Sequence, residues 1–395
     1  MKNKRALKRI GTVFLILLSL VILVWLTVFI ISKIRLSRDR AFLEEQGYCN
    51  PVSAGDYSVN VLSFGNENGK HRIIAIAGQG IPDLCITMRR MTAALESENQ
   101  VIFIDRAGYG ISDDTKQEMT VENIVEAYRT ALKNVGIKAP YVLMPHSIGG
   151  LYATYWESKY PDEIEAVAII DGTELEAISA EKEAGFKPES EVYLYHWMVR
   201  LGLGGTGNLF LRKYLPPKDW LTADEQRMEY ALALMTYDSR ALVSEGELEY
   251  RNINAAWDAI VTNDIPKIYI STAYFTAEDI EADGILTDDT IEELMNQRRA
   301  LKAMLEEQYR NGEIPQDVYY EHLPELPDTQ AERRQTALED YLENGRDYRE
   351  RILLPYLEKL GSCELVSLPG DHLIYEQKPD ECGSMIKGFI DGLDA

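Results

Sequence analysis

The chain of 395 residues has few cysteines and few histidines, and this scarcity excludes several kinds of site. Its four cysteines are widely spaced, with no Cys-x-x-Cys pair and no neighbouring histidine, so neither a zinc site nor a disulfide framework is indicated. An exported domain could still form one bridge. No low-complexity tract and no internal repeat interrupts the chain. We therefore expect a globular protein without a metal or an organic cofactor.

Basic residues are scarce over most of the chain. Nine of the 41 Lys and Arg, but only one of the 64 Asp and Glu, precede residue 41, so the remainder holds 32 basic and 63 acidic residues, a net charge of −31. A surface of this sign repels phosphate backbones. We expect no nucleic-acid partner, and nothing in the sequence indicates the oligomeric state.

One long apolar run, residues 11–32, contains no charge. As a helix it would extend roughly 33 Å, enough to cross a bilayer. A signal peptide is the alternative, but its apolar region is shorter and ends in small residues before a cleavage site. Here SKIRLSRDR follows, so we expect an uncleaved single-pass anchor. Five Lys and Arg precede the run and four follow it, which favours a cytoplasmic tail (1–10), a linker (33–54) and an extracellular catalytic domain.

Beyond the anchor, short continuous apolar runs alternate with helical patterns. Runs of this kind suit strands buried on both faces of a parallel sheet, and the alternation predicts a doubly wound, mostly parallel α/β domain. We expect a core in two parts (55–172 and 264–395), a helical cap (173–263) and a helical insertion (284–346). The predicted strands are 57–64, 72–78, 101–105, 141–147, 166–171, 267–272 and 363–368.

The segment YVLMPHSIGGLYATYWESK carries the strongest functional signal. A buried strand ends at Ser147 and passes directly into a helix, with Gly149 two residues later. A serine on such a tight turn is held above the sheet edge, and the following helix directs its N-terminal N–H groups at the same place.

This segment resembles the nucleophile elbow of the α/β-hydrolase family. Three further motifs follow the family in chain order: Ala77-Gly78-Gln79-Gly80 at the oxyanion loop, the DRAGYGISD segment (105–113), and Gly370-Asp371-His372 after the last strand. The resemblance covers roughly residues 55–172 and 264–395. Two positions depart from it, because Pro145 replaces the first glycine of the elbow and Ala77 replaces the usual histidine of the oxyanion loop.

The resemblance implies a role for each motif. Ser147 would attack a carbonyl carbon, and His372 would remove its proton and later return it to the leaving group. The backbone N–H groups of Gln79 and Ile148 would bind the oxyanion. Asp105 and Arg106 are expected to fix the loop below the pocket, and His146 to make local contacts.

The triad acid is left open between two places. Most of the family carries it a few residues after the penultimate strand, where Tyr274 and Phe275 stand here, with Glu278 and Asp279 following. The haloalkane dehalogenase-like branch carries it one strand earlier, at the position of Asp171. We favour Asp171.

The predicted activity is hydrolysis of an ester, or of a related amide or thioester, in a small acyl substrate. The alternatives are an aminopeptidase-like hydrolase of the same fold and a non-catalytic ectodomain that binds a ligand. Substrate contacts are expected from the cap, whereas the aromatic residues on the helix after the elbow are expected to pack in the core. The cap residues are Tyr193, Tyr195, Trp197 and Met198; the core residues are Tyr152, Tyr155 and Trp156.

Overall fold

The computed structural model describes residues 2–188, 190–204 and 215–394. Its centre is an eight-stranded sheet with the order β1-β2-β4-β3-β5-β6-β7-β8. Strand β2 runs antiparallel to both of its neighbours, and all pairs from β4 to β8 are parallel. The predicted α/β fold class is confirmed. The strands are β1 (Pro51–Ser53), β2 (Ser58–Gly65), β3 (Arg72–Ile76), β4 (Gln100–Asp105), β5 (Tyr141–Ser147), β6 (Ile164–Gly172), β7 (Lys267–Ser271) and β8 (Cys363–Ser367).

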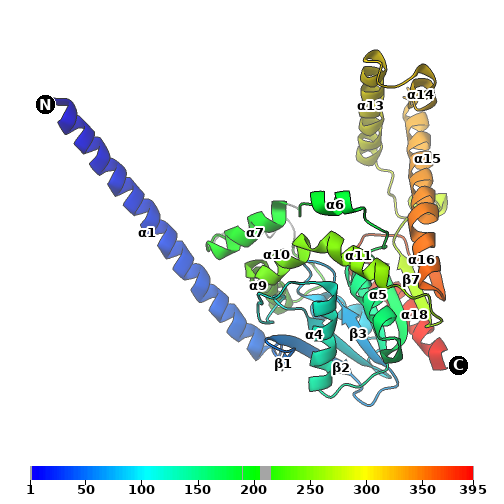
Figure 1. Cartoon of the computed structure of the whole chain (residues 1–395), viewed down its shortest axis with the longest axis horizontal. Coiled ribbons are helices and arrows are strands. Elements are labelled where there is room, and N and C mark those ends of the chain that lie inside the picture. Colours follow the sequence, from blue (N-terminus) through cyan, green and yellow to red (C-terminus); the bar gives the residue numbers. More distant parts are fainter. Residues whose placement is uncertain (1, 189, 205–214, 395) are drawn as a thin grey trace.

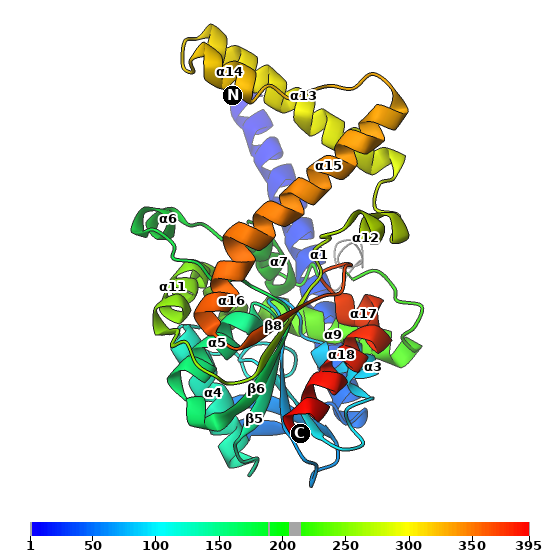
Figure 2. The same cartoon turned by 90° about the vertical axis from the view of Figure 1, so that its right-hand side faces the viewer.

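Helices cover both faces of this sheet, as the continuous apolar strands require. Figure 2 shows α4, α5 and α16 on one face and α3, α17 and α18 on the other. Tyr152 and Trp156 on α5 are fully buried in the first layer, as predicted. The helices are α2 (Leu84–Thr87), α3 (Arg89–Thr92), α4 (Val121–Asn134), α5 (Gly149–Lys159), α16 (Leu354–Leu360), α17 (Ile374–Gln377) and α18 (Pro379–Asp391), with short 3₁₀ turns at Pro161–Glu163 and Gly392–Asp394.

The strand order reverses between β3 and β5, which lie side by side although β4 separates them in sequence. The chain leaves β3 toward one face and β5 toward the other, so the loops after these strands diverge. In open α/β sheets such a reversal leaves a crevice at the carboxyl ends of the strands. The loops after β3, β5, β6 and β8 all meet at this edge.

The segment between β6 and β7 forms the helical cap. Helices α7 and α9 of the cap pack against each other, and α11 packs on α5. The helices are α6 (Ala180–Gly185), α7 (Ser190–Arg200), α9 (Ala223–Asp238), α10 (Arg240–Glu247) and α11 (Glu249–Ala259).

The insertion between β7 and β8 is an arm of antiparallel helices that projects away from the sheet (Figure 1). Its base has a hydrophobic cluster of its own around Met295 and Ala337, and Arg298 pairs with Asp340 across the two long helices. Thr287 caps the first of them, because its side chain accepts the Thr290 N–H. The helices are α12 (Ala277–Ala282), α13 (Asp288–Arg310), α14 (Gln316–Glu321) and α15 (Gln330–Tyr348), which continues through a π-turn (Arg349–Leu353).

The N-terminal helix α1 (Lys2–Glu45) is twice as long as the apolar run it contains. It continues without a break through residues 33–45, which the sequence assigns to a linker, and β1 then begins at Pro51. Pairs such as Arg35–Asp39 and Arg40–Glu44, one turn apart, support the helix there. The predicted linker is therefore corrected for residues 33–45, because helix α1 takes them up and runs directly into the domain (Figure 1).

Candidate active site

Ser147 is the last residue of β5, and its backbone takes a positive φ of 55°. This conformation is uncommon for a residue with a side chain and marks a sharp bend. The chain is close-packed beyond it, because a Cβ at Gly149 would lie 2.6 Å from the Ile76 carbonyl oxygen. Helix α5 starts immediately afterwards. The tight turn forms even though Pro145, paired with Ile76 of β3, replaces the usual glycine.

The structure brings His372 and Asp171 together. The Nδ1 atom of His372, in the loop after β8, lies 2.6 Å from Asp171 Oδ2 at the end of β6. The other carboxylate oxygen of Asp171 accepts the Thr272 backbone N–H at 3.1 Å. The two alternative acids stand elsewhere: Glu278 and Asp279 are in the first turn of α12, where Asp279 accepts the Thr276 hydroxyl.

The Asp171–His372 contact keeps Asp171 ionised and orients the imidazole of His372. Burial by itself raises the pKa of Asp171, but the hydrogen bonds from His372 and Thr272 lower it below its ordinary value. Because an ionised carboxylate only accepts, Nδ1 of His372 carries the hydrogen, and Nε2 is left as the basic atom of the ring. Asp171 also has a positive φ of 40°, so backbone strain marks two of the three predicted catalytic residues.

His146 connects the loop of His372 to the elbow. Its Nε2 atom lies 2.9 Å from the His372 carbonyl oxygen, and the two rings are 4.6 Å apart. A carbonyl only accepts, so Nε2 of His146 is protonated; burial lowers the pKa of this ring to about 4 and keeps it neutral. Among the described residues, no hydrogen bond joins Ser147 Oγ to His372. Such contacts are often loose before substrate binds.

The predicted oxyanion donors, Gln79 and Ile148, lie on the loops that flank Ser147. Within the described part of the chain, neither backbone N–H donates to another group of the protein. The two loops touch, because a Cβ at Gly78 would lie 3.0 Å from Ser147 Cβ. Both N–H groups are therefore available beside the nucleophile.

Arg106 holds the oxyanion loop from below. It is buried, and its guanidinium donates to the carbonyl oxygens of Ala77 at 2.5 Å and Gly78 at 2.7 Å. These bonds orient the peptide groups just before Gln79. The structural role predicted for Arg106 agrees with this arrangement.

Glu245 of cap helix α10 completes this network, and sequence reasoning missed it. Its fully buried carboxylate lies 3.1 Å from Arg106 Nε and accepts the hydroxyls of Tyr109, at 2.5 Å, and Tyr152. Tyr109 in turn accepts the Gly80 N–H at 3.0 Å. No local motif surrounds Glu245, so only the folded chain reveals that the cap supports the oxyanion loop.

The four cap residues expected to contact substrate have different surroundings. Tyr195 is buried against Tyr237, which lies beside Gly80. Tyr193 donates to Glu247 at 2.7 Å, and Met198 is half-buried. Trp197 is 57% exposed, and its contact with substrate stays a prediction.

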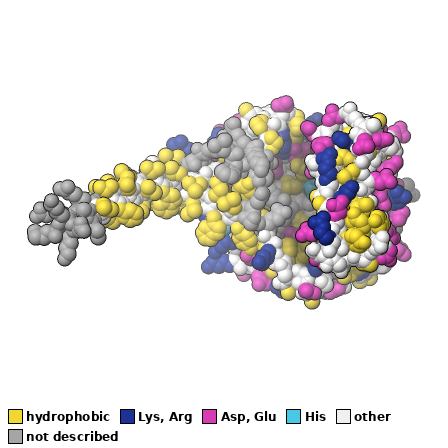
Figure 3. Space-filling view, turned by 90° about the horizontal axis from the view of Figure 1, so that it is seen from above, with side chains coloured by type: hydrophobic (Ala, Val, Ile, Leu, Met, Phe, Trp, Pro, Cys, Tyr) yellow, Lys and Arg dark blue, Asp and Glu magenta, His cyan; other side chains and the backbone are white. Residues whose placement is uncertain are grey.

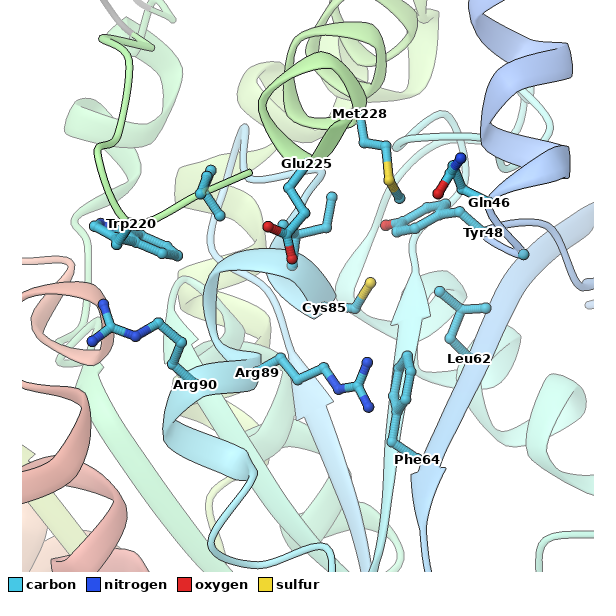
Figure 4. Close-up of a pocket in the computed structure, with 13 residues that line it drawn as sticks. Gln46, Tyr48, Leu62, Phe64, Cys85, Arg89, Arg90, Trp220, Glu225 and Met228 are labelled. Atoms are coloured by element: carbon cyan, nitrogen blue, oxygen red, sulfur yellow. The ribbon is translucent and has the colours of Figure 1, made fainter. Parts of the chain in front are cut away.

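A groove of about 420 Å³ lies apart from these residues, at the foot of α1. Figure 4 shows Tyr48, Phe64, Arg89, Trp220 and Met228 around it. None of the three predicted catalytic residues lines it. The four cysteines are free, and the described residues contain no cluster of metal ligands.

Comparisons with known proteins point to the same fold. A family model described as the alpha/beta hydrolase fold matches residues 80–198. YbdG of Bacillus subtilis (strain 168) is 36% identical over 164 residues, 42% of this chain and 49% of YbdG. A vacuolar membrane protein of Saccharomyces cerevisiae (strain YJM789) is 26% identical over 133 residues, 30% of this chain and 21% of that protein. The chain spans about half, or less, of the length of these relatives.

Solved structures align over most of the chain at low sequence identity. The haloalkane dehalogenase DbeA from Bradyrhizobium elkani USDA94 covers 87% of this chain and 98% of its own at 12% identity, with a TM-score of 0.48. A structure from work on carboxylesterases of Nitrososphaera gargenis covers 87% and 99% at 14% identity, with a TM-score of 0.47. These likenesses concern the fold alone.

Proposed function

Because the chain is a member of the α/β-hydrolase fold family, we propose that it is a membrane-anchored serine hydrolase. It cleaves a carboxylic ester, or a related acyl bond, through an acyl-enzyme on Ser147. One observation carries the proposal: the 2.6 Å contact between His372 Nδ1 and Asp171 Oδ2, on the loops next to a serine held at φ 55°. A structural serine needs neither the strained bend nor an oriented imidazole beside it.

The geometry supports a two-step reaction. His372 Nε2 accepts the Ser147 proton as Oγ bonds to the carbonyl carbon, and the N–H groups of Gln79 and Ile148 bind the resulting oxyanion. Collapse breaks the bond to the leaving alcohol, which takes the proton from His372. Water then repeats the sequence on the acyl-enzyme, releases the acid and restores Ser147.

An aminopeptidase-like reaction has less support. It requires free acidic groups in or near the cap to bind the substrate amine. The buried acids Glu229 and Glu376 already flank the ammonium of Lys218, at 2.7 and 2.8 Å. These two buried acids are therefore paired with a cation of the chain itself and are not free to bind a substrate amine.

Labelling with a fluorophosphonate tests the proposal, since this reagent reacts with an activated serine. We expect the wild-type full chain in detergent to be labelled and to hydrolyse p-nitrophenyl butyrate. Ser147→Ala should lose labelling and at least about 10³-fold of the turnover. Ser384→Ala, an exposed serine on α18, is the matched control and should retain both.

Two outcomes contradict the proposal. The first is a wild type that is not labelled under conditions that label a control hydrolase, which is the behaviour of a non-catalytic binding domain. The second is a Ser147→Ala variant that retains its turnover. A faster reaction with aminoacyl arylamides than with p-nitrophenyl esters would favour the peptidase instead.

A membrane-impermeant fluorophosphonate applied to intact cells tests the orientation of the domain. An outward-facing domain should be labelled without lysis of the cells.

A further inference from the structure

The outer face of the cap has an exposed apolar surface beside the anchor helix. Leu194 and Trp197 on α7, and Leu201 just after it, are 52%, 57% and 42% exposed. Figure 3 shows hydrophobic side chains along α1 that continue onto the neighbouring part of the domain. Exposed apolar surface of this kind is unfavourable in water and marks a binding surface.

This cap segment contacts α1 within its apolar half. The indole Nε1 of Trp25 donates to the Leu201 carbonyl oxygen at 3.2 Å. A Cβ at Gly202 would lie 2.8 Å from Phe29 Cα, so the two backbones are in close contact there. Trp25 and Phe29 belong to the uncharged run that is long and apolar enough to cross a membrane. The cap therefore reaches the level of the span itself.

Contacts between α1 and the cap change from apolar to charged one turn beyond Phe29. Lys33 Nζ lies 3.0 Å from Asp238 Oδ2, and Arg227 pairs with Asp39 at 3.0 Å. The polar boundary thus lies near Lys33. Trp25 and Phe29 precede it by about 12 and 6 Å at about 1.5 Å per residue. Helices that lie in a bilayer surface are buried to about 5–10 Å.

The opposite face of α7 is directed toward the active site. Tyr195 packs on Tyr237, with ring centroids 5.6 Å apart, and His196 Nδ1 lies 3.0 Å from the Tyr237 carbonyl oxygen. Tyr237 Oη would be 3.9 Å from a Cβ at Gly80, next to the predicted oxyanion donor Gln79. Helix α7 and the Tyr237 side chain of α9 thus lie between the exposed apolar face and the oxyanion loop.

We propose that α7 and the start of the following loop lie in the surface of the bilayer that α1 crosses, and that the substrate is a long-chain acyl ester of a membrane lipid. The inference rests on the proposed ester hydrolysis and on α1 as the anchor. The occupant of the apolar face is one leaflet, because this face is continuous with the span. A lipid leaving that leaflet meets the cap before it meets water.

Two substrates separate this inference from the proposed function. The full chain is reconstituted in phosphatidylcholine vesicles and given either water-soluble p-nitrophenyl butyrate or vesicle-embedded 4-methylumbelliferyl oleate. The variant Leu194→Glu/Leu201→Glu places two charges on the apolar face. We expect at least a tenfold loss with the oleate ester and less than a twofold change with the butyrate ester. The control Val261→Glu/Ile352→Glu, at similarly exposed positions away from α7, should change neither rate.

A second measurement does not depend on activity. Vesicles of brominated phosphatidylcholine quench tryptophans in the acyl region, and Trp197→Phe should remove part of this quenching, whereas Trp257→Phe should not. The inference is overturned if both double variants lose oleate turnover equally, or if Trp197 contributes no quenching. It is also overturned if the apolar face instead joins two copies, so that Leu194→Glu/Leu201→Glu dissociates a dimer without any quenching of Trp197. A wild type that shows neither labelling nor turnover of either ester would refute the proposed function. The quenching of Trp197 would still test whether the apolar face lies in the bilayer.

Discussion

Arg106 connects three parts of the molecule that are distant in sequence. It lies just after β4, donates to two carbonyl groups of the oxyanion loop, and pairs with Glu245 of the cap. A guanidinium can serve these partners at once because its donors form a planar fork, which an ammonium lacks. The position of the Gln79 N–H therefore depends on a side chain that does not touch the substrate.

We expect Arg106→Lys to lower kcat for p-nitrophenyl butyrate by about 10- to 100-fold, a part of the loss seen when an oxyanion donor is removed. KM should change by less than about threefold, because the substrate pocket itself is not altered. Arg129→Lys is the matched control, since Arg129 forms an equally bidentate pair with Glu163 away from the site. Steady-state kinetics would contradict the positioning role if both variants kept the wild-type kcat.

The three predicted catalytic residues follow from their positions at strand ends, but the supporting residues do not. Ser147 and Asp171 each end an apolar run, and His372 follows the last one, so the sequence alone places all three at one sheet edge. Glu245 lies in the cap, 139 residues after Arg106, in a helix with no motif. Its role depends on how the cap packs, which the period of apolar residues does not specify.

Among the elements, the cap is fastened to the helix that follows His372. Lys218, before α9, pairs with Glu229 on α9 and with Glu376 on α17. Asp83, before α2, completes the cluster; burial raises its pKa, the charge of Glu229 raises it further and Lys218 opposes the rise. One ammonium thus compensates several buried acids.

Asp83 binds its proton more tightly in the folded chain than in the unfolded one, so the free energy of unfolding should fall as the pH rises above about 4. Lys218→Met removes the compensating charge and should steepen this fall, with a loss of about 3–5 kcal/mol at pH 8 that diminishes toward pH 5. Thermal unfolding of the detergent-solubilised chain measures both. Lys387→Met, at an exposed pair on α18, should follow the wild type; a pH-independent loss in Lys218→Met would contradict the assignment.

The strands, the cap and the arm could be predicted because each has a strong apolar period or a capping residue. Strand β1 could not be predicted, because three residues are too few to show an alternation of apolar and polar side chains. Its pairing with β2 depends on tertiary packing. The helical course of residues 33–45 was hidden by its charges, which suit a solvated linker and an exposed helix equally well.

At the scale of the whole molecule, the absence of a joint in α1 matters most. The helix passes from the apolar run to Glu45 without interruption, and its last turns are held to α9 by the Arg227–Asp39 pair. Leu43 is buried in the domain core, so the end of the helix is part of the fold. Helix α1 thus continues into the domain without an intervening loop.

A continuous helix of this kind would transmit its tilt to the domain. A hydrophobic stretch that exceeds the thickness of its bilayer tilts, and a domain fused rigidly to it must tilt with it. Lipid thickness would then set how closely the mouth of the site approaches the leaflet. We expect oleate-ester turnover to vary severalfold across phosphatidylcholine vesicles of increasing chain length, and Ser37→Pro, which kinks the exposed stretch of α1, to flatten that variation where Ser37→Ala does not. Equal rates in bilayers of every thickness would mean that the tilt of α1 does not control access to the site. If the rates vary as expected, the lipid composition of a membrane would by itself set the activity of this hydrolase.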